Sequence, residues 1–416
     1  MGIQGLFQLL KPIIVETNLR EFEGQTWAID MMCWLYKGVY SWSYEIAKNF
    51  ESFSYLSFPL KMIKILQSFN IKPICVFDGL PLNAKYATES GRREEKLKNK
   101  HKGELLDKQG NHEEAKKYFG KSMVISSKMI NLFIEILHKL DIEVIIAPYE
   151  ADAQINFLWR EGLADFGVSE DSDIVVFGWP TLVCKLQPTG DWSVIRINQL
   201  WDKSFSKKIE DPTLKELSQF NEEVFILIWI MSGWDYLPSM DRMGLKTGIK
   251  NFVKYKNFKA IMRNLSEHKT FKGKIPKNYT ETVLKVRDLF LHQTIYDPIK
   301  YKCRPLNDIP EGTVIDQAFL GKYIDEDKLP KYVRGWLDKY TLEPREVFDP
   351  DVKRIKDGMR DNDITMSTFY YLKNKYDFTK KQTNDDNEEE KFDSNKQGKL
   401  NSDELLFFLF KLKISN

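Results

Sequence analysis

The segment that decides the fold is IEVIIAPYEADAQ, residues 142–154. Its first half is rich in β-branched residues and predicts a buried strand over Ile142 to Ala147, which Pro148 stops. Acidic residues follow directly. The same plan of an apolar strand followed by acid recurs at residues 25–30, 71–77 and 165–169, and apolar character resumes over 173–178. Helix-forming segments separate these strands, so the sequence predicts an α/β fold with a mostly parallel sheet flanked by helices.

Each of the four predicted strands ends in acid. In an open parallel sheet, ligand sites form at the carboxyl ends of the strands, so these side chains are expected to converge on one crevice. Taken singly, each acid has a simpler explanation as a turn former, a helix cap or a solvated acidic turn. Those explanations do not account for the presence of acid at the end of every predicted strand. The six strand-end acids are Asp30, Asp78, Glu150, Asp152, Asp171 and Asp173.

Six converging carboxylates would repel one another strongly unless cations neutralised them. Oxygen ligands select hard divalent ions, and the chain has only five histidines, so Mg²⁺ or Mn²⁺ is favoured over Zn²⁺. Two such ions about 4 Å apart could stabilise the attacking and leaving oxygens of a phosphate displacement. The pattern therefore indicates metal-dependent chemistry on phosphate esters.

Charge and cysteine content bound the class of protein. The chain has 416 residues, of which 42% are hydrophobic, and its net charge of +2 conceals 62 basic and 60 acidic residues. The four cysteines are far apart and form no CxxC pair, so neither a zinc site nor a disulfide framework is expected, and a reducing intracellular compartment is the default. The sequence contains no apolar run long enough to cross a bilayer and no secretory signal pattern.

The remainder of the chain is mainly helical. A basic, helix-permissive insertion runs from Asn83 to Lys128, and an amphipathic helix follows to Leu140. From about Asn221 the chain turns helical again, with a turn at Ser232 to Tyr236. Residues 382–399 are polar and charged and predict a disordered tail. The apolar run at 405–410 either packs on the body or binds a partner, and the sequence leaves both open.

Several blocks in order resemble the flap endonuclease superfamily of the XPG/Rad2 type. They are MGIQGL at the start, VFDG at 76–79, APYEADAQ at 147–154, SEDSD at 169–173 and SGWDY at 232–236. The start, GRR at 91–93 and DPIK at 297–300 are most similar to the exonuclease 1 branch. The resemblance covers residues 1 to about 307 and implies a PIN-like nuclease fold with a helix-two-turn-helix element.

The resemblance also implies roles for individual residues. Asp30, Asp78 and Glu150 match the ligands of one metal, and Asp152, Asp171, Asp173 and Asp235 match those of the other. Lys85 and Arg92 match basic residues that reach the scissile phosphate, where cations would stabilise transition-state charge. Removal of the initiator methionine would leave Gly2 near the active site. Without the resemblance, Asp235 reads as a cap in a turn, and the basic insertion reads equally well as a solvated face.

DNA contacts are implied in the same way. They are Tyr36, Arg93, Lys185, Ser239, Arg242, Gly244 and Lys246. Tyr36 stands where relatives commonly have His, and a tyrosine can still stack on a base. Trp234 stands where small residues are usual, and Arg242 comes closest to replacing an expected glycine. These departures weaken the case for a K⁺ site at the helix-two-turn-helix, while Arg242 and Lys246 still suit phosphate contact.

The expected organisation comprises an N-terminal nuclease region (1–99), a helical insertion (100–137, continuing the basic segment from 83) and an internal nuclease region (138–225). A helix-two-turn-helix region (226–310), an extension wrapping the core (311–380) and a tail (381–416) follow. The predicted activity is 5′→3′ double-stranded DNA exonuclease with 5′-flap endonuclease activity. The alternatives are a primary flap endonuclease and a non-catalytic DNA-binding scaffold.

The resemblance also suggests the setting of this activity. The expected cofactors are two Mg²⁺ ions, which Mn²⁺ can replace. The expected partners are DNA with 5′ ends, nicks, gaps or flaps, and mismatch-repair or sliding-clamp proteins. The protein is expected to be a monomer in the nucleus, with the mitochondrion as the alternative.

Overall fold

The structure is a computed structural model that describes residues 6–345, except 49–52, 172, 178–180, 185–190, 234, 238, 241 and 270. The chain divides into two compact units. The sheet unit comprises Met1–Cys33, Ile74–Glu94 and Val144–Arg345, and the helical unit comprises Trp34–Pro73, Glu95–Glu143 and Glu346–Asn416. The predicted tail and the apolar run at 405–410 lie outside the described residues. No described helix is long and apolar enough to cross a membrane.

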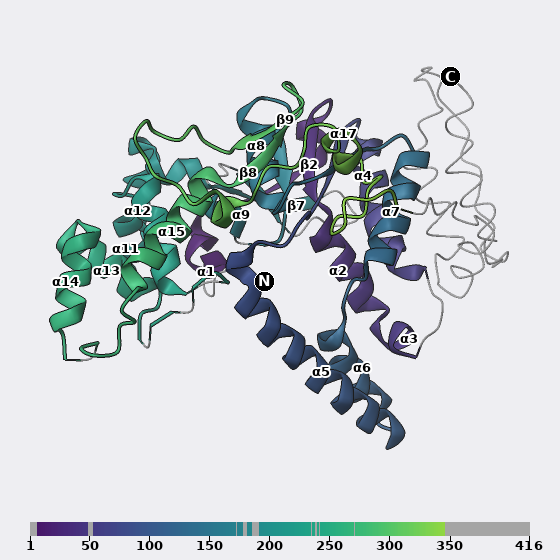
Figure 1. Cartoon of the computed structure of the whole chain (residues 1–416), viewed down its shortest axis with the longest axis horizontal. Coiled ribbons are helices and arrows are strands. Elements are labelled where there is room, and N and C mark those ends of the chain that lie inside the picture. Colours follow the sequence, from purple (N-terminus) through teal and green to yellow (C-terminus); the bar gives the residue numbers. More distant parts are fainter. Residues whose placement is uncertain are drawn as a thin grey trace, which may run out of the picture. The chain divides into compact units, whose positions relative to one another are not determined.

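A seven-stranded sheet, in the order β1-β7-β6-β5-β2-β3-β4, organises the sheet unit. Figure 1 labels two of its strands, β2 and β7. Strands β2, β5 and β6 pair in parallel, whereas β7 runs antiparallel to both β6 and β1. The expected α/β class with a parallel centre is confirmed, and the antiparallel edge was not predicted. The strands are β1 Ile14–Asn18, β2 Thr26–Asp30, β3 Lys72–Phe77, β4 Glu143–Ile146, β5 Phe166–Val168, β6 Thr181–Cys184 and β7 Asp191–Arg196.

The four predicted strands correspond to β2, β3, β4 and β5, with ends that differ by at most one residue from the expected ones. Five of the six residues of β3 and four of the five of β2 are buried. Burial on both faces explains why these strands read as continuous apolar runs and not as alternating patterns. The apolar run that begins at Asp173 forms a short helix, α9 (Asp173–Val176).

Helix α8 (Ala151–Arg160) packs on β2 and β5 and contacts the hairpin of β8 (Thr294–Asp297) and β9 (Lys302–Pro305). The Gln154 amide on α8 accepts from the Tyr296 backbone N–H and donates to its carbonyl, both at 2.8 Å, which fixes the hairpin to the helix. The other α-helices of the unit are α1 Leu6–Leu10, α10 Lys203–Ser206, α11 Pro212–Leu217, α12 Glu222–Ser232, α13 Leu245–Tyr255, α14 Phe258–Glu267, α15 Tyr279–His292, α16 Gln317–Leu320 and α17 Leu329–Val333.

Short 3₁₀ helices join several of these elements. They are η1 Lys11–Ile13, η2 Leu19–Phe22, η4 Asn83–Lys85 and η5 Ile197–Trp201 in the sheet unit, and η3 Ser54–Leu56 in the helical unit. Aromatic rings fill the core beside β2. The rings of Phe22, Trp27 and Trp192 lie 4.7–5.9 Å apart, centroid to centroid, and both indoles are fully buried.

The helical unit is built from α3 (Ser43–Ala47), α4 (Ser57–Ser68), α6 (His112–Ser122), α7 (Ser127–Lys139) and most of α2 (Met31–Ser41) and α5 (Tyr86–Lys108). The predicted helix over 31–48 is thus two helices, α2 and α3, and the predicted basic insertion forms α5 and α6. Asp107 on α5 is buried and accepts from Tyr44 Oη at 2.6 Å, from His112 Nδ1 at 2.8 Å and from Lys48. This cluster fastens α3 to the α5–α6 hairpin.

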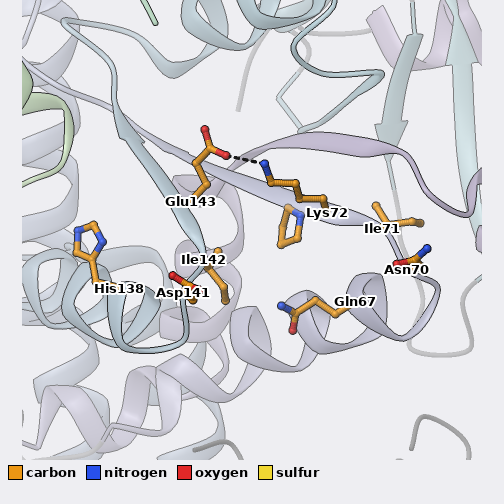
Figure 2. A pocket seen from close by; sticks show the side chains of 9 residues that line it. Gln67, Asn70, Ile71, Lys72, His138, Asp141, Ile142 and Glu143 are labelled. Carbon is orange, nitrogen blue, oxygen red and sulfur yellow. Dashed lines mark ion pairs between the residues drawn. The ribbon is translucent and has the colours of Figure 1, made fainter. Parts of the chain in front are cut away.

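A pocket of about 590 Å³ lies in the helical unit (Figure 2). The ends of α4 and α7 and the first residues of β3 and β4 form it, and an ion pair between Lys72 Nζ and Glu143 Oε2 at 3.0 Å crosses its wall. Asn70 and Asp141 each adopt a left-handed conformation, with φ of 55° and 58°, as the chain leaves a helix for a strand. None of the residues predicted for the functional site lines this pocket.

Candidate metal and phosphate site

The parallel pairing of β2 with β5 brings the acid at the end of one strand beside the residues that follow the other. Ile29 is paired with Val168, so Asp30 and Ser169 are neighbours across the ladder. Ser169 Oγ donates to Asp30 Oδ2 at 3.0 Å and accepts from the backbone N–H of Asp171 at 3.0 Å. One hydroxyl thereby connects the acids at two strand ends.

Asp30 is the most buried of the described acids of the site, with 6% of its surface exposed. Its Oδ1 caps α2 by accepting from the N–H groups of Met32 and Cys33, at 3.0 and 3.3 Å. Burial, and then the negative charges of Asp78 and Asp171, raise the pKa of Asp30 from 3.8 to about 6. Asp30 is therefore a helix cap that also lies within electrostatic reach of Asp78 and Asp171.

Asp78 and Glu150 are brought together by the segments that leave β3 and β4. The backbone N–H groups of Gly79 and Leu80 donate to the carbonyls of Tyr149 and Pro148, at 2.7 and 3.0 Å. A Cβ on Gly79 would lie 1.8 Å from the Ala147 carbonyl oxygen, so this close approach requires glycine.

The same approach places the Asp78 carboxylate at the start of α8. Asp78 Oδ1 accepts from the Ala151 N–H at 2.9 Å, next to Glu150 at the N-cap. Burial and the charge of Asp78 raise the pKa of Glu150, and the Lys85 ammonium partly offsets that rise.

Two cations from η4 and α5 bind acids of the same site. Lys85 Nζ lies 2.5 Å from Glu150 Oε2 and 5.0 Å from the centroid of the Tyr236 ring. Arg92 Nη2 lies 2.5 Å from Asp235 Oδ1, and Thr88 Oγ1 donates to the Asp235 carbonyl. The dipeptide Asp235-Tyr236 thus holds both of the basic residues predicted to face the scissile phosphate.

Four further residues were predicted for the functional site; two lie on described helices and two lie outside the described residues. Asp152 lies half-buried in the first turn of α8, and Asp173 begins α9, although its side chain is not described. Gly2 and Lys185 lie outside the described residues. Among the described side chains, no three His, Cys, Asp or Glu residues are arranged to hold one metal ion. Asp30, Asp78, Glu150 and Asp171 lie within electrostatic reach of their neighbours, while Glu150 and Asp235 are bonded to Lys85 and Arg92.

The loop between α12 and α13 carries the predicted duplex contacts. Gly233 ends α12 with φ of 99°, and a Cβ there would lie 2.5 Å from Ser239 Cβ, so the loop folds back on itself. Gly244 is the N-cap of α13, and Ser239, Arg242, Gly244 and Lys246 are all exposed. Arg242 has φ of 63°, the left-handed region that glycine adopts most readily. That conformation explains why the resemblance leads one to expect glycine close to this position.

Tyr36 and Arg93 lie on two different helices. Tyr36 is half-buried on α2, with Lys96 Nζ 5.5 Å from its ring centroid, and both residues belong to the helical unit. Arg93 is exposed on the part of α5 that belongs to the sheet unit.

Sequence reasoning assigned no role to Tyr236 or Lys96. Tyr236 lies within a quoted motif, SGWDY, and its adjacency to Asp235 was the signal that could have identified it. The contact between Lys96 and Tyr36 joins residues sixty positions apart, and no sequence pattern indicates it.

Comparisons with known proteins identify the family of this chain. The XPG N-terminal domain model matches residues 1–99, and the XPG I-region model matches residues 141–235. The DNA damage-inducible protein DIN7 of Saccharomyces cerevisiae is 32% identical over 318 residues, which cover 76% of this chain and 72% of that protein. The chain therefore belongs to the XPG family.

Within this family, the similarity extends to the exonuclease 1 proteins. Exonuclease 1 of Danio rerio is 32% identical over 360 residues, covering 86% of this chain and 43% of that protein, so the chain spans less than half of that relative's length. Among solved structures, the catalytic core of Rad2 in complex with DNA substrate matches with a TM-score of 0.48 and 19% identity, covering 86% of this chain and 95% of that one.

Proposed function

We propose that this protein is a divalent-metal-dependent 5′ nuclease: a 5′→3′ double-stranded DNA exonuclease that also cleaves 5′ flaps. The observation that carries the proposal is the gathering of acids from separate strand ends, together with the ion pairs of Lys85 with Glu150 and of Arg92 with Asp235. Membership of the XPG family, with relatives named exonuclease 1, supports the same activity.

The acids suit Mg²⁺ in chemistry and in electrostatics. All donors are carboxylate oxygens, which hard divalent ions prefer. Burial and then the charge of Asp78 raise the pKa values of Asp30 and Glu150, so both carboxylates are costly to ionise without a bound cation. Asp30, Asp78 and Glu150 would hold one ion, and Asp152, Asp171, Asp173 and Asp235 would hold the second. When bound, such a pair supplies charge neutralisation and an activated water for phosphodiester hydrolysis.

Lys85 and Arg92 would bind the scissile phosphate. Each is bonded to a proposed metal ligand, so metal binding and phosphate binding would both draw on these ion pairs. A phosphate that takes up the two cations would release Glu150 and Asp235 toward metal. Positive charge held at this position stabilises the additional negative charge of a phosphoryl transition state.

Duplex DNA would lie across the α12–α13 loop, where Ser239, Arg242, Gly244 and Lys246 are exposed. Backbone N–H groups at the start of α13 suit phosphate oxygens, because a helix N-terminus carries unsatisfied donors and partial positive charge. K⁺ is proposed as an additional ion at this loop. A nuclear role as a monomer in DNA repair, with mismatch-repair or sliding-clamp partners, completes the proposal.

The decisive experiment is cleavage of end-labelled DNA. We expect wild-type protein to degrade nicked duplex from the 5′ end and to cut a 5′ flap in Mg²⁺, and to do neither in EDTA. Asp171→Asn should abolish cleavage while leaving DNA binding within a few-fold, since it removes a proposed ligand without adding charge repulsion. Asp327→Asn, an exposed acid remote in sequence from the site, is the matched control. Full cleavage by Asp171→Asn would contradict the metal assignment.

Two outcomes would favour the alternatives. Efficient flap cutting with little degradation of nicked duplex would make the protein primarily a flap endonuclease. DNA binding without cleavage at any Mg²⁺ or Mn²⁺ concentration would make it a scaffold.

A further inference from the structure

The basic charge of the chain is concentrated in one segment. Residues 242–277 contain eleven Lys or Arg residues and one acid, Glu267, a net charge of +10. Because the whole chain has a net charge of only +2, the remainder carries −8. The segment starts in the α12–α13 loop, but most of it lies beyond, in α13, α14 and the connection to α15.

The basic residues of α13 and α14 form stripes opposite the buried faces. On α13, Lys246, Lys250 and Lys254 recur every four residues and are exposed, whereas Ile249 and Phe252 are buried. On α14, Lys259 and Arg263 are exposed four residues apart, and Ile261 and Leu265 are buried. Lys269, just past α14, is also exposed. We name Lys259, Arg263 and Lys269 the α14 strip.

Within the described residues, no ion pair with a carboxylate stabilises either stripe. Like charges four residues apart on a helix repel one another, and no residue of the α14 strip forms an ion pair with a carboxylate in the described part of the chain. On α15 the chain uses the opposite arrangement, with Lys285 Nζ 3.0 Å from Glu281 Oε1 four residues away. The lack of carboxylate partners for the α14 strip is explained if a bound polyanion neutralises its charge.

The α14 strip lies one helix farther from the sheet than the loop described above. Helix α12 packs on α13, and α13 packs on α14, so α14 is the outer member of the three (Figure 1). The left-handed residue Lys256, with φ of 56°, turns the chain, and Asn257 caps α14 by accepting from the Ala260 N–H at 3.3 Å. This short, capped connection places the two basic stripes on consecutive, packed helices.

We propose that the α14 strip is a second phosphate-binding surface, which extends the contact with duplex DNA beyond the α12–α13 loop by about one helix width, ~10 Å. This inference rests on the proposed function only for the identity of the polyanion. Flexible lysines suit a regular row of phosphates, and this contact does not read base sequence. It lengthens the stretch of duplex that the protein requires.

The test is salt-dependent binding in EDTA, where no cleavage occurs. The variant is Lys259→Gln/Arg263→Gln/Lys269→Gln, and the matched control is Lys300→Gln/Lys302→Gln/Lys322→Gln, three exposed lysines of the same unit. Each is measured on flap substrates with duplex arms of about 8 and about 20 base pairs, ~27 and ~68 Å long. Thermal melting of both variants checks that they fold.

On the long arm, the α14 strip variant should reduce the slope of log K against log salt by about 3. Each of its three lost phosphate contacts contributes ~0.9 to that slope. Its affinity at 0.15 M salt should fall on the order of 100-fold by the same relation. The short arm and the control should show no change. A long-arm slope equal to that of the control, or an equal loss on both arms, overturns the inference.

Anionic vesicles containing phosphatidylserine provide a further arm of the experiment. If the variant loses vesicle binding but keeps wild-type duplex binding, the strip belongs to a membrane contact and the inference fails. Failure of the proposed function is separate, because it would appear as absence of cleavage by the wild type in Mg²⁺. If the wild type cleaves DNA but the α14 strip variant binds duplex as tightly as the wild type, only the extended contact is refuted.

Discussion

Replacing Asp30 by Asn should stabilise the metal-free protein at pH 8 and not at pH 4. Asp30 is nearly fully buried, and burial together with the charges of Asp78 and Asp171 raises its pKa from 3.8 to about 6. A raised carboxyl pKa is a penalty on the ionised form. The penalty is absent below pH 3.8, grows as the pH rises to about 6, and is complete above that.

The expected change in stability follows from the pKa shift of Asp30 and from the hydrogen bonds that its side chain forms. About two pKa units correspond to ~3 kcal/mol of lost stability at pH 8. Asparagine keeps an oxygen for the Met32 and Cys33 N–H groups but cannot accept the Ser169 hydroxyl hydrogen, a loss of about 1 kcal/mol. The Asp30→Asn substitution should therefore raise the free energy of unfolding by on the order of 1–2 kcal/mol at pH 8 and lower it by about 1 kcal/mol at pH 4.

The assay is thermal or urea unfolding in EDTA at both pH values. Asp202→Asn is the control, because Asp202 is an exposed cap of α10 whose pKa the Ser204 hydroxyl and neighbouring N–H groups lower. A lowered carboxyl pKa stabilises the fold above the unfolded pKa, and that stability is lost as the pH falls. Asp202→Asn should thus be more damaging at pH 8 than at pH 4, the opposite trend. An Asp30→Asn variant that is equally destabilised at both pH values would refute the raised pKa of Asp30.

Three further changes test individual contacts. Lys85→Met should reduce cleavage about 100-fold and leave duplex affinity within a few-fold; an unchanged rate at saturating substrate would show that Lys85 does not act on the phosphate. Tyr236→Leu should reduce cleavage about 10-fold by removing the ring beneath the Lys85 ammonium, whereas Tyr236→Phe should retain it, and equal losses in both variants would exclude a role for the ring. Gly79→Ala should lower the free energy of unfolding by about 3 kcal/mol, because its Cβ would meet the Ala147 carbonyl oxygen, while Gly91→Ala, with open space around it, should be neutral or stabilising; similar stability of the two would contradict the close approach.

Sequence alone determined the α/β class and four neighbouring strands of the sheet. Strands buried on both faces must be apolar throughout, so β2, β3, β4 and β5 were readable as continuous runs. The acid after each of them was equally visible. The other three strands, β1, β6 and β7, were not identified. β1, at the edge of the sheet, has no buried residue and so carries a weaker apolar signal.

Tertiary structure alone decided which charged groups are partners. Lys85 with Glu150 and Arg92 with Asp235 join residues that are 65 and 143 positions apart, and no local pattern encodes such pairs. The same holds for the Lys85 ammonium over the Tyr236 ring and for the Ser169 hydroxyl between Asp30 and Asp171. Local sequence determines the ends of strands through hydrophobic periodicity and turn residues. The pairing of distant charged residues depends instead on which strands, helices and loops lie side by side in the folded chain.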